Sequence, residues 1–258
     1  MATFVTVHGG WGGGWEWTQV AQELREQGHE VFTPTLSGLG DREHLGGATT
    51  SVSDHIDDVI KLLEFEQLRD VVLCGHSYSG IVVTGVADRV PERIKLLVYV
   101  DAFIADDGQA IKDLVPRNFF EEIMRSVAER GDGTFLPPEE LLASLKALPE
   151  AKRGSYISRL RPQGLPTFTE PVRLSGAISR VTRAFVRCTQ DDDMAPFAKR
   201  AESEGWLYRE MPTPHDPQLF APEVTARVLV ELADVAAPVA ADQASLTGAG
   251  QAQSPPGR

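Results

Sequence analysis

The sequence predicts an α/β fold, a mainly parallel twisted sheet with helices on both faces and an inserted helical cap. Short apolar runs alternate with helical patterns along most of the chain, as they do in consecutive βαβ units. This alternation stops between residues 105 and 179, where charged helical segments replace the strands. With 258 residues, 42% of them hydrophobic, the chain can bury a core of the size that such a sheet needs.

The elements of the first 104 residues follow from apolar spacing and from the residues that end each run. An apolar stripe that includes Ile56, Val59 and Leu63 repeats at helical spacing, whereas Gly28 ends one helix and Pro34 stops one strand. Strands are expected at 3–7, 30–33, 71–75 and 94–100, and helices at 17–27, at 51–65 and between Gly80 and Pro91.

The remaining residues divide into three parts. Residues 105–179 are expected to form the cap, with helices at 119–130 and 138–148. The sheet resumes with strands at 183–188 and 206–208 and helices at 194–204 and 222–236, so that residues 1–104 and 180–236 form the core. Residues 237–258 lack apolar periodicity and are predicted to be a disordered tail.

Charge and composition exclude several classes of partner. The formal net charge is −12, which disfavours nucleic acid and anionic membranes because both require clustered Lys and Arg. Cys74 and Cys188 each close an apolar run, which indicates buried thiols rather than a disulfide. No signal peptide or membrane span is evident. We therefore expect a cytoplasmic protein with a small-molecule substrate, and leave room for a homodimer.

The most informative stretch is Gly75-His76-Ser77-Tyr78-Ser79-Gly80, between an apolar strand and a helix. A strand that turns sharply into a helix exposes the central serine and needs small residues two positions before and after it, which is the G-x-S-x-G nucleophile elbow. Here Ser79 replaces the second glycine and Gly80 follows. Ser77 is the predicted nucleophile; the alternative is a serine that only caps the helix.

The first strand ends in a loop with five glycines between Gly9 and Gly14. A dinucleotide-binding fingerprint beginning at Gly10 would need glycine where Trp15 stands, so we expect no nucleotide cofactor. Two cysteines without ligand spacing give no sign of a metal site. The loop is better explained as one whose Gly10 amide faces the nucleophile.

A serine nucleophile requires a base, and the base requires an orienting acid. In this architecture the chain order is Ser, acid, His. Of the histidines, only His215 follows all the predicted strands, so it is the predicted base. By position we favour Asp191 as the acid, early in the loop after strand 183–188; Asp192, Asp193 and above all Asp101 compete with it.

These segments resemble the α/β-hydrolase superfamily over residues 3–236. Val7-His8-Gly9-Gly10-Trp11, Gly28-His29-Glu30-Val31 and Cys188-Thr189-Gln190-Asp191 are similar to the branch that contains plant salicylate-binding methylesterases and hydroxynitrile lyases. The last segment matches the acid segment of that branch and supports Asp191. The resemblance implies acyl transfer, in which Ser77 attacks an ester carbonyl and the amides of Gly10 and Tyr78 form the oxyanion hole.

Other functions remain open at this stage. The lyases of that branch have a threonine after the first-strand histidine and a lysine after the catalytic histidine, where this chain has Gly9 and Asp216, so the departures favour an esterase. A lyase, cyclase or other cofactor-free enzyme for aromatic or polyketide-like substrates, or a non-catalytic receptor, could use the same fold. Several aromatic side chains are candidates for a substrate pocket: Trp11, Trp15, Phe103, Phe119 and Phe120.

Overall fold

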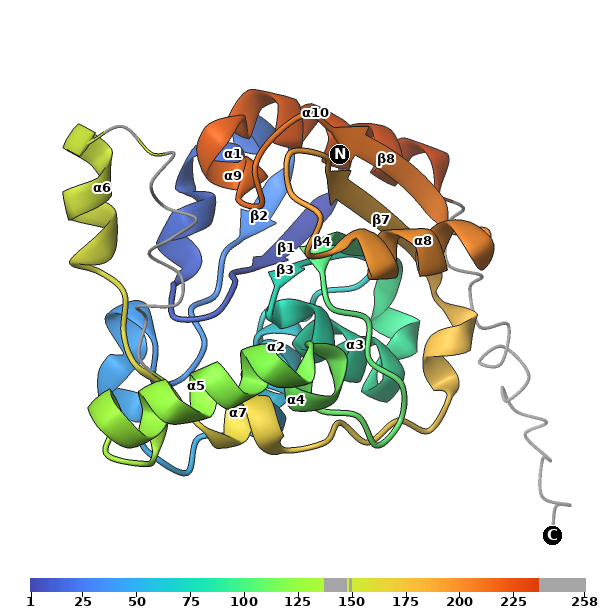
Figure 1. Ribbon diagram of the computed structural model, residues 1–258. Coiled ribbons are helices and arrows are strands. Elements are labelled where there is room, and N and C mark those ends of the chain that lie inside the picture. Colours follow the sequence, from blue (N-terminus) through green and yellow to red (C-terminus); the bar gives the residue numbers. More distant parts are fainter. Residues whose placement is uncertain (137–147, 149, 237–258) are drawn as a thin grey trace, which may run out of the picture.

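The computed structural model describes residues 1–136, 148 and 150–236 (Figure 1). Six parallel strands form one sheet in the order β2-β1-β3-β4-β7-β8. Their bounds are β1 Thr3–Val7, β2 Glu30–Phe32, β3 Val71–Ser77, β4 Ile94–Ala102, β7 Thr182–Cys188 and β8 Leu207–Met211. The predicted strands are all present, and β3, β4 and β8 extend beyond the predicted ends.

Alternate residues of the central strands face opposite layers of helices, because successive side chains of a strand point to opposite faces. Val72 and Cys74 of β3 pack with α1 (Thr18–Glu26) and α10 (Pro222–Val235). Val71 and Leu73 face the layer that contains α2 (Val52–Phe65), α3 (Ser79–Arg89) and α8 (Ala195–Ser203). In Figure 1, α1 and α10 lie above the sheet and α2 and α3 below it. The predicted parallel sheet covered on both faces is thereby confirmed.

The strand order reverses between β1 and β3, because β2 lies on one side of β1 and all later strands lie on the other. The carboxyl ends of the strands on either side of such a reversal diverge and leave a crevice, where open α/β sheets bind ligands. The glycine loop follows β1 at this point, and Ser77 ends β3.

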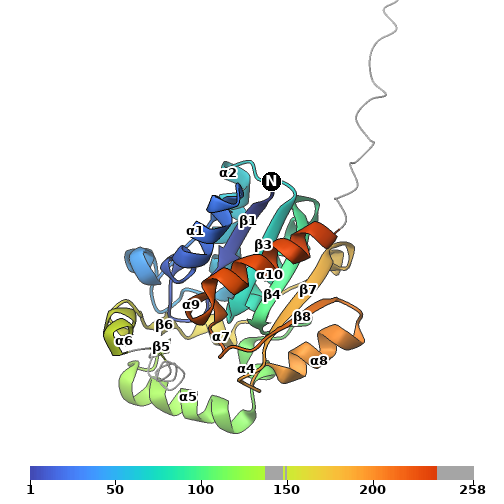
Figure 2. The same cartoon turned by 90° about the horizontal axis from the view of Figure 1, so that it is seen from above.

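The segment between β4 and β7, residues 105–179, is called the cap below. It contains α4 (Ile111–Leu114), α5 (Arg117–Arg130), α6 (Glu150–Ile157) and α7 (Pro166–Thr169). Figure 2 shows these elements gathered at the carboxyl ends of the strands. Most of the helix predicted at 138–148, and the tail at 237–258, lie outside the described residues. The division into a core of residues 1–104 and 180–236 and an inserted cap of residues 105–179 stays a prediction.

The cap also contains a feature that the apolar pattern did not predict. β5 (Phe135–Leu136) pairs antiparallel with β6 (Gln163–Gly164). Each strand is two residues long, too short for an alternating pattern to be visible in the sequence. The remaining elements are short: η1 Gly14–Trp17, η2 Gly40–Leu45, η3 Pro91–Arg93, η5 Ala177–Arg180 and α9 Pro217–Phe220.

Candidate active site

Ser77 lies at the sharp turn from β3 into α3, with a φ of 52°. Positive φ in a residue with a side chain costs about 1–3 kcal/mol and persists only where the surroundings enforce it. Gly75 permits the turn, because a Cβ there would lie 2.6 Å from Val83 Cγ2. A Cβ on Gly80 would lie 2.1 Å from the carbonyl oxygen of Phe103. The helix α3 and the chain that follows β4 (Ile94–Ala102) therefore approach each other closely at Gly80.

Ser79, which replaces the second glycine of the motif, fits at the turn with its buried hydroxyl hydrogen-bonded. Ser79 is fully buried, and its hydroxyl lies 2.9 Å from the carbonyl oxygens of Val7 and His76, either of which can accept its proton. Because a buried hydroxyl with an acceptor carries little penalty, the G-x-S-x-S-G sequence still forms the elbow.

Three side chains from separate parts of the chain form a continuous hydrogen-bonded relay. The Nε2 atom of His215 lies 2.9 Å from Ser77 Oγ, and Nδ1 lies 2.7 Å from Asp101 Oδ2. The second oxygen of Asp101 accepts the backbone N–H of Cys188 at 3.0 Å. Ser77 and Asp101 come from the adjacent strands β3 and β4, and His215 comes from the loop after β8. This is the arrangement of a Ser-His-Asp triad.

The choice of Asp191 as the partner of His215 is wrong, because Asp101 occupies that place. After β7, the backbone N–H groups of Thr189 and Gln190 bond to the carbonyls of Met211 and Thr213. These bonds hold the chain to the extension of β8. Asp191 Oδ1 then accepts the N–H of Asp193 at 3.1 Å within its own loop.

Asp101 is instead the penultimate residue of β4, which lies between β3 and β7, and it has a φ of 44° and a fully buried side chain. Its carboxylate can therefore reach both His215 and Cys188. The other two acids of the loop do not replace it: Asp192 pairs with Arg187 at 3.0 Å, and Asp193 is exposed.

The charges around His215 favour its protonated form. Burial lowers the pKa of His215, but the hydrogen bond to Asp101 and the charges of Asp216, Asp101 and Asp191 outweigh burial and raise the pKa to about 9. Asp216 is itself buried, and burial raises the pKa of its carboxyl. Asp191 thus contributes to the field at His215 although it does not bond to the ring.

His76 supports the loop that carries His215. Its Nε2 donates to the carbonyl oxygen of His215 at 2.9 Å, and the two rings lie 4.8 Å apart. Burial lowers the pKa of His76 to about 3, so the ring is neutral near pH 7. With Nε2 protonated, Nδ1 faces the Gln218 amide at 3.4 Å.

The backbone amides of Gly10 and Tyr78 are the predicted oxyanion donors, and the structure places the two residues side by side. A Cβ on Gly10 would lie 3.7 Å from Tyr78 Cβ, and one on Gly9 would lie 3.4 Å from Ser77 Cβ. Among the described residues, neither of these two amides has a hydrogen-bond acceptor. The phenol of Tyr78 points away into the core, where its hydroxyl meets His55 Nδ1 at 2.9 Å and its ring stacks on Phe168.

Behind the glycine loop lies a carboxyl group that the sequence analysis did not single out. Glu16 is 4% exposed, and its Oε1 accepts the hydroxyl of Tyr156 from α6 at 2.7 Å. Burial raises the pKa of Glu16 to about 8. The available signal was the position of Glu16 between Trp15 and Trp17, because a carboxyl group between large apolar side chains is rarely buried in its charged form. In the described part of the chain, no three His, Cys, Asp or Glu side chains cluster as metal ligands.

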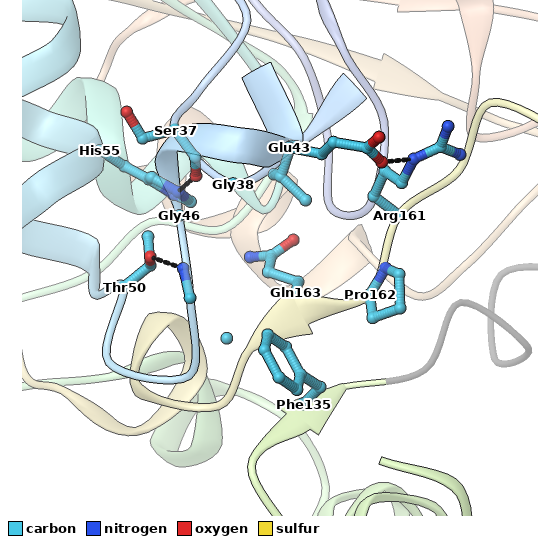
Figure 3. Close-up of a pocket in the computed structure, with 13 residues that line it drawn as sticks. Ser37, Gly38, Glu43, Gly46, Thr50, His55, Phe135, Arg161, Pro162 and Gln163 are labelled. Carbon is cyan, nitrogen blue, oxygen red and sulfur yellow. Dashed lines mark hydrogen bonds and ion pairs between the residues drawn. The ribbon is translucent and has the colours of Figure 1, made fainter. Parts of the chain in front are cut away.

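The five predicted pocket aromatics do not form one group. Trp11 packs against Phe168, Trp15 packs edge-on against Tyr156, and Phe103 packs against Phe197. Phe119 is 39% exposed on α5, and Phe120 next to it is partly buried. Their role as a substrate pocket stays a prediction. A cavity of about 320 Å³ lies nearby, between the loop 37–50 and β6, and is lined by neither Ser77 nor His215 (Figure 3).

Comparison with known proteins agrees with this geometry. The chain matches the model of the alpha/beta hydrolase family over residues 4–228. It is 36% identical over 244 residues to a carbendazim hydrolyzing esterase of Nocardioides sp. (strain SG-4G), covering 90% of this chain and 100% of that protein. Methylesterase 9 of Arabidopsis thaliana is 26% identical over 266 residues, covering 91% and 99% of the two chains.

Two further likenesses concern the branch and the fold. An alpha-hydroxynitrile lyase of Arabidopsis thaliana is 29% identical over 159 residues, covering 61% of this chain and 58% of the lyase. An extracellular alpha/beta-hydrolase from a Paenibacillus species, described as sharing homology with tobacco salicylic acid binding protein 2, superposes with a TM-score of 0.78 at 23% identity, covering 90% and 99% of the chains. The resemblance to this branch is confirmed, and the chain belongs to the alpha/beta hydrolase family.

Proposed function

We propose that the protein is a serine esterase that cleaves a small, apolar or aromatic carboxylic ester through an acyl-enzyme. The observation that carries this proposal is the unbroken relay from Asp101 through His215 to Ser77, with separations of 2.7 and 2.9 Å. These distances are within the range in which a base can accept the proton of a nucleophile. The enzyme class itself follows from the family and from the esterase relatives.

In the proposed reaction, Ser77 Oγ attacks the ester carbonyl while His215 Nε2 takes its proton. The negative charge that develops on the carbonyl oxygen is held by the amides of Gly10 and Tyr78. Collapse of the tetrahedral intermediate breaks the bond to the alkoxy oxygen, which receives the proton from His215. Water then attacks the acyl-enzyme with His215 again as base, and this step releases the acid and restores Ser77.

Asp101 orients His215 and stabilises the imidazolium that forms in each half of the reaction. It accepts from Nδ1, which leaves Nε2 of the neutral ring unprotonated and directed at Ser77. The N–H of Cys188 on the other oxygen of Asp101 fixes the plane of the carboxylate. Both ends of the relay are therefore held by regular strands, β3 and β4.

Cyanohydrin cleavage is disfavoured by the residue after His215. The lyases of this branch have a lysine there, whereas this chain has Asp216, a buried carboxyl that brings no positive charge to the site. A non-catalytic receptor would bind esters without turning them over. The buried, unpaired thiols of Cys74 and Cys188 support a cytoplasmic location, and a homodimer stays a prediction.

The test is ester hydrolysis by the wild type and by Ser77→Ala. The panel comprises p-nitrophenyl acetate, methyl jasmonate and carbendazim, since relatives are named for the last two. We expect turnover by the wild type and its loss in Ser77→Ala at an almost unchanged melting temperature, because an elbow serine contributes little packing. Ser203→Ala, the same change on the exposed end of α8, is the control and should retain activity. Wild-type turnover by Ser77→Ala would refute the proposal.

A further inference from the structure

The loop that carries the proposed oxyanion donor is bonded to the cap at one residue, Trp11. The backbone N–H of Trp11 donates to Gln163 Oε1 at 2.9 Å. The carbonyl oxygen of Trp11 accepts the backbone N–H of Arg161 at 3.0 Å. Its indole Nε1 donates to the carbonyl oxygen of Leu136 at 3.0 Å. All three partners lie on or beside the β5–β6 ribbon of the cap.

Trp11 needs these bonds because its backbone is strained. Its φ is 62°, in the left-handed region that a bulky side chain rarely adopts. Such a conformation persists only where neighbouring groups determine it. Without the bond to Gln163, the peptide between Gly10 and Trp11 could turn toward a relaxed conformation, and the glycines on both sides of Trp11 would offer little resistance.

Gln163 is suited to hold that peptide. Its side chain is 1% exposed, and its carboxamide nitrogen donates to Thr167 Oγ1 at 2.8 Å. The hydroxyl of Thr167 donates in turn to the carbonyl oxygen of Gly164 at 2.7 Å. This chain of bonds fixes which end of the carboxamide faces Trp11, so that the oxygen rather than the nitrogen meets the amide. Figure 3 shows Gln163 at the cavity wall, with Phe135 and Pro162 beside it.

The same oxygen also lies beside Gly10, the residue whose N–H is the proposed oxyanion donor. A Cβ on Gly10 would be 3.5 Å from Gln163 Oε1 and 3.7 Å from Tyr78 Cβ. Gly10 is therefore enclosed between the cap carboxamide on one side and the elbow on the other. If Gln163 moved, Gly10 would no longer be held at its present position relative to Ser77.

We propose that Gln163 is a positioning residue for the oxyanion hole: through its bond to the N–H of Trp11 it holds Gly10 in place, so that the Gly10 N–H faces the carbonyl oxygen of an ester bound at Ser77. This inference rests on the proposed esterase function. It assigns to the cap a part in transition-state stabilisation, besides any part in enclosing the substrate. Gln163 acts through Gly10 and does not touch the reacting atoms.

The test compares Gln163→Met with Gln163→Glu. Methionine fills similar space without an acceptor, so we expect kcat for p-nitrophenyl acetate to fall about 10- to 100-fold with KM nearly unchanged, below the 10²–10³-fold loss of a deleted donor. Glutamate restores an acceptor for Trp11, and kcat should return to within about 3-fold of the wild type. Should Gln163→Met not fold, Gln163→Asn, whose amide is one methylene shorter, replaces it with the same expectation.

A second readout reports on the oxyanion itself. Trifluoroacetophenone forms a hemiketal with an active serine and places its oxyanion in the hole, whereas acetophenone binds only as a neutral ketone. Gln163→Met should weaken the inhibition by trifluoroacetophenone by the same factor as kcat and leave that by acetophenone unchanged. Thr169→Val is the structural control, because it removes a hydroxyl from α7 in the same cap, and that hydroxyl donates to the carbonyl oxygen of Leu165 at 3.2 Å rather than to Gln163.

The outcomes separate the two proposals. A wild type that hydrolyses no ester and is not inhibited by trifluoroacetophenone would refute the esterase function, and this inference with it. An active wild type whose kcat and trifluoroacetophenone inhibition survive in Gln163→Met would refute the inference alone. Equal losses in Thr169→Val and Gln163→Met, or no recovery in Gln163→Glu, would assign Gln163 to cap stability and also refute it.

Discussion

Replacement of Asp101 by asparagine should nearly abolish esterase activity, whereas the same change at Asp191 should leave it within about 3-fold of the wild type, since only Asp101 orients the base. The structure supplies the reason at Asp101. Its two oxygens face two donors, the Nδ1–H of His215 and the N–H of Cys188. An asparagine can offer an oxygen to only one of them.

If the asparagine oxygen stays on Cys188, its NH₂ group faces Nδ1 and forces the ring proton onto Nε2. His215 then has no lone pair for the proton of Ser77. If the amide turns round, its NH₂ opposes the buried N–H of Cys188 instead. The loss in kcat for a triad in the wrong tautomer is about 10⁴-fold, equivalent to about 5.5 kcal/mol of transition-state stabilisation.

Asp191→Asn loses no such contact, because the asparagine oxygen can still accept the N–H of Asp193. The assay is steady-state hydrolysis of p-nitrophenyl acetate at saturating substrate, with the melting temperature of each variant as a check of folding. An inactive Asp191→Asn together with an active Asp101→Asn would refute the reasoning, because it would mean that the catalytic acid lies in the loop after β7.

Three further predictions concern proton binding and packing. The kcat/KM of the wild type should rise with pH and level off above about 9, since only neutral His215 acts as base. Asp216→Asn should move this rise to lower pH, because the charge of Asp216 helps to raise the pKa of His215. A pH–rate profile of the wild type that rises near pH 6.5 would contradict the raised pKa. The melting temperature of Glu16→Gln should exceed that of the wild type by a growing margin as pH rises from about 5 to 8. In that window folded Glu16 keeps the proton that the unfolded chain has lost, so a rising pH destabilises the wild type relative to Glu16→Gln; parallel plots of melting temperature against pH would show that Glu16 ionises normally. Gly75→Ala should lower the melting temperature and kcat, because its Cβ would lie 2.6 Å from Val83 and overpacking costs about 1–3 kcal/mol; an unchanged melting temperature would show that the elbow adjusts.

The sequence predicted most of the fold, because apolar periodicity and chain-breaking residues mark each long element. It also placed Ser77 and His215, since the elbow has a local signature and the chain order leaves one late histidine. The acid was not determined in this way. Asp101 lies at the carboxyl end of β4, and Asp191 lies shortly after β7. The choice between them depends on the direction of the backbone beyond these two strands, and hydrogen bonds to residues far away in the sequence determine that direction.

Gln163 and Glu16 show a second limit of the sequence. Gln163 lies 152 positions from the amide that it holds, in a strand of two residues. Glu16 meets a partner 140 positions away on α6. Neither contact produces a local pattern in the sequence, because each depends on how the cap packs against the rest of the chain.

The position of the acid at the end of β4 has a consequence for engineering. Because Asp101 bonds directly to His215, the loop that follows β7 has no side chain in the triad. Residues 191–193 therefore offer a point at which a foreign peptide could be grafted close to the site without removing a triad residue. The three acidic residues there could also be exchanged to change the charge that an approaching substrate meets.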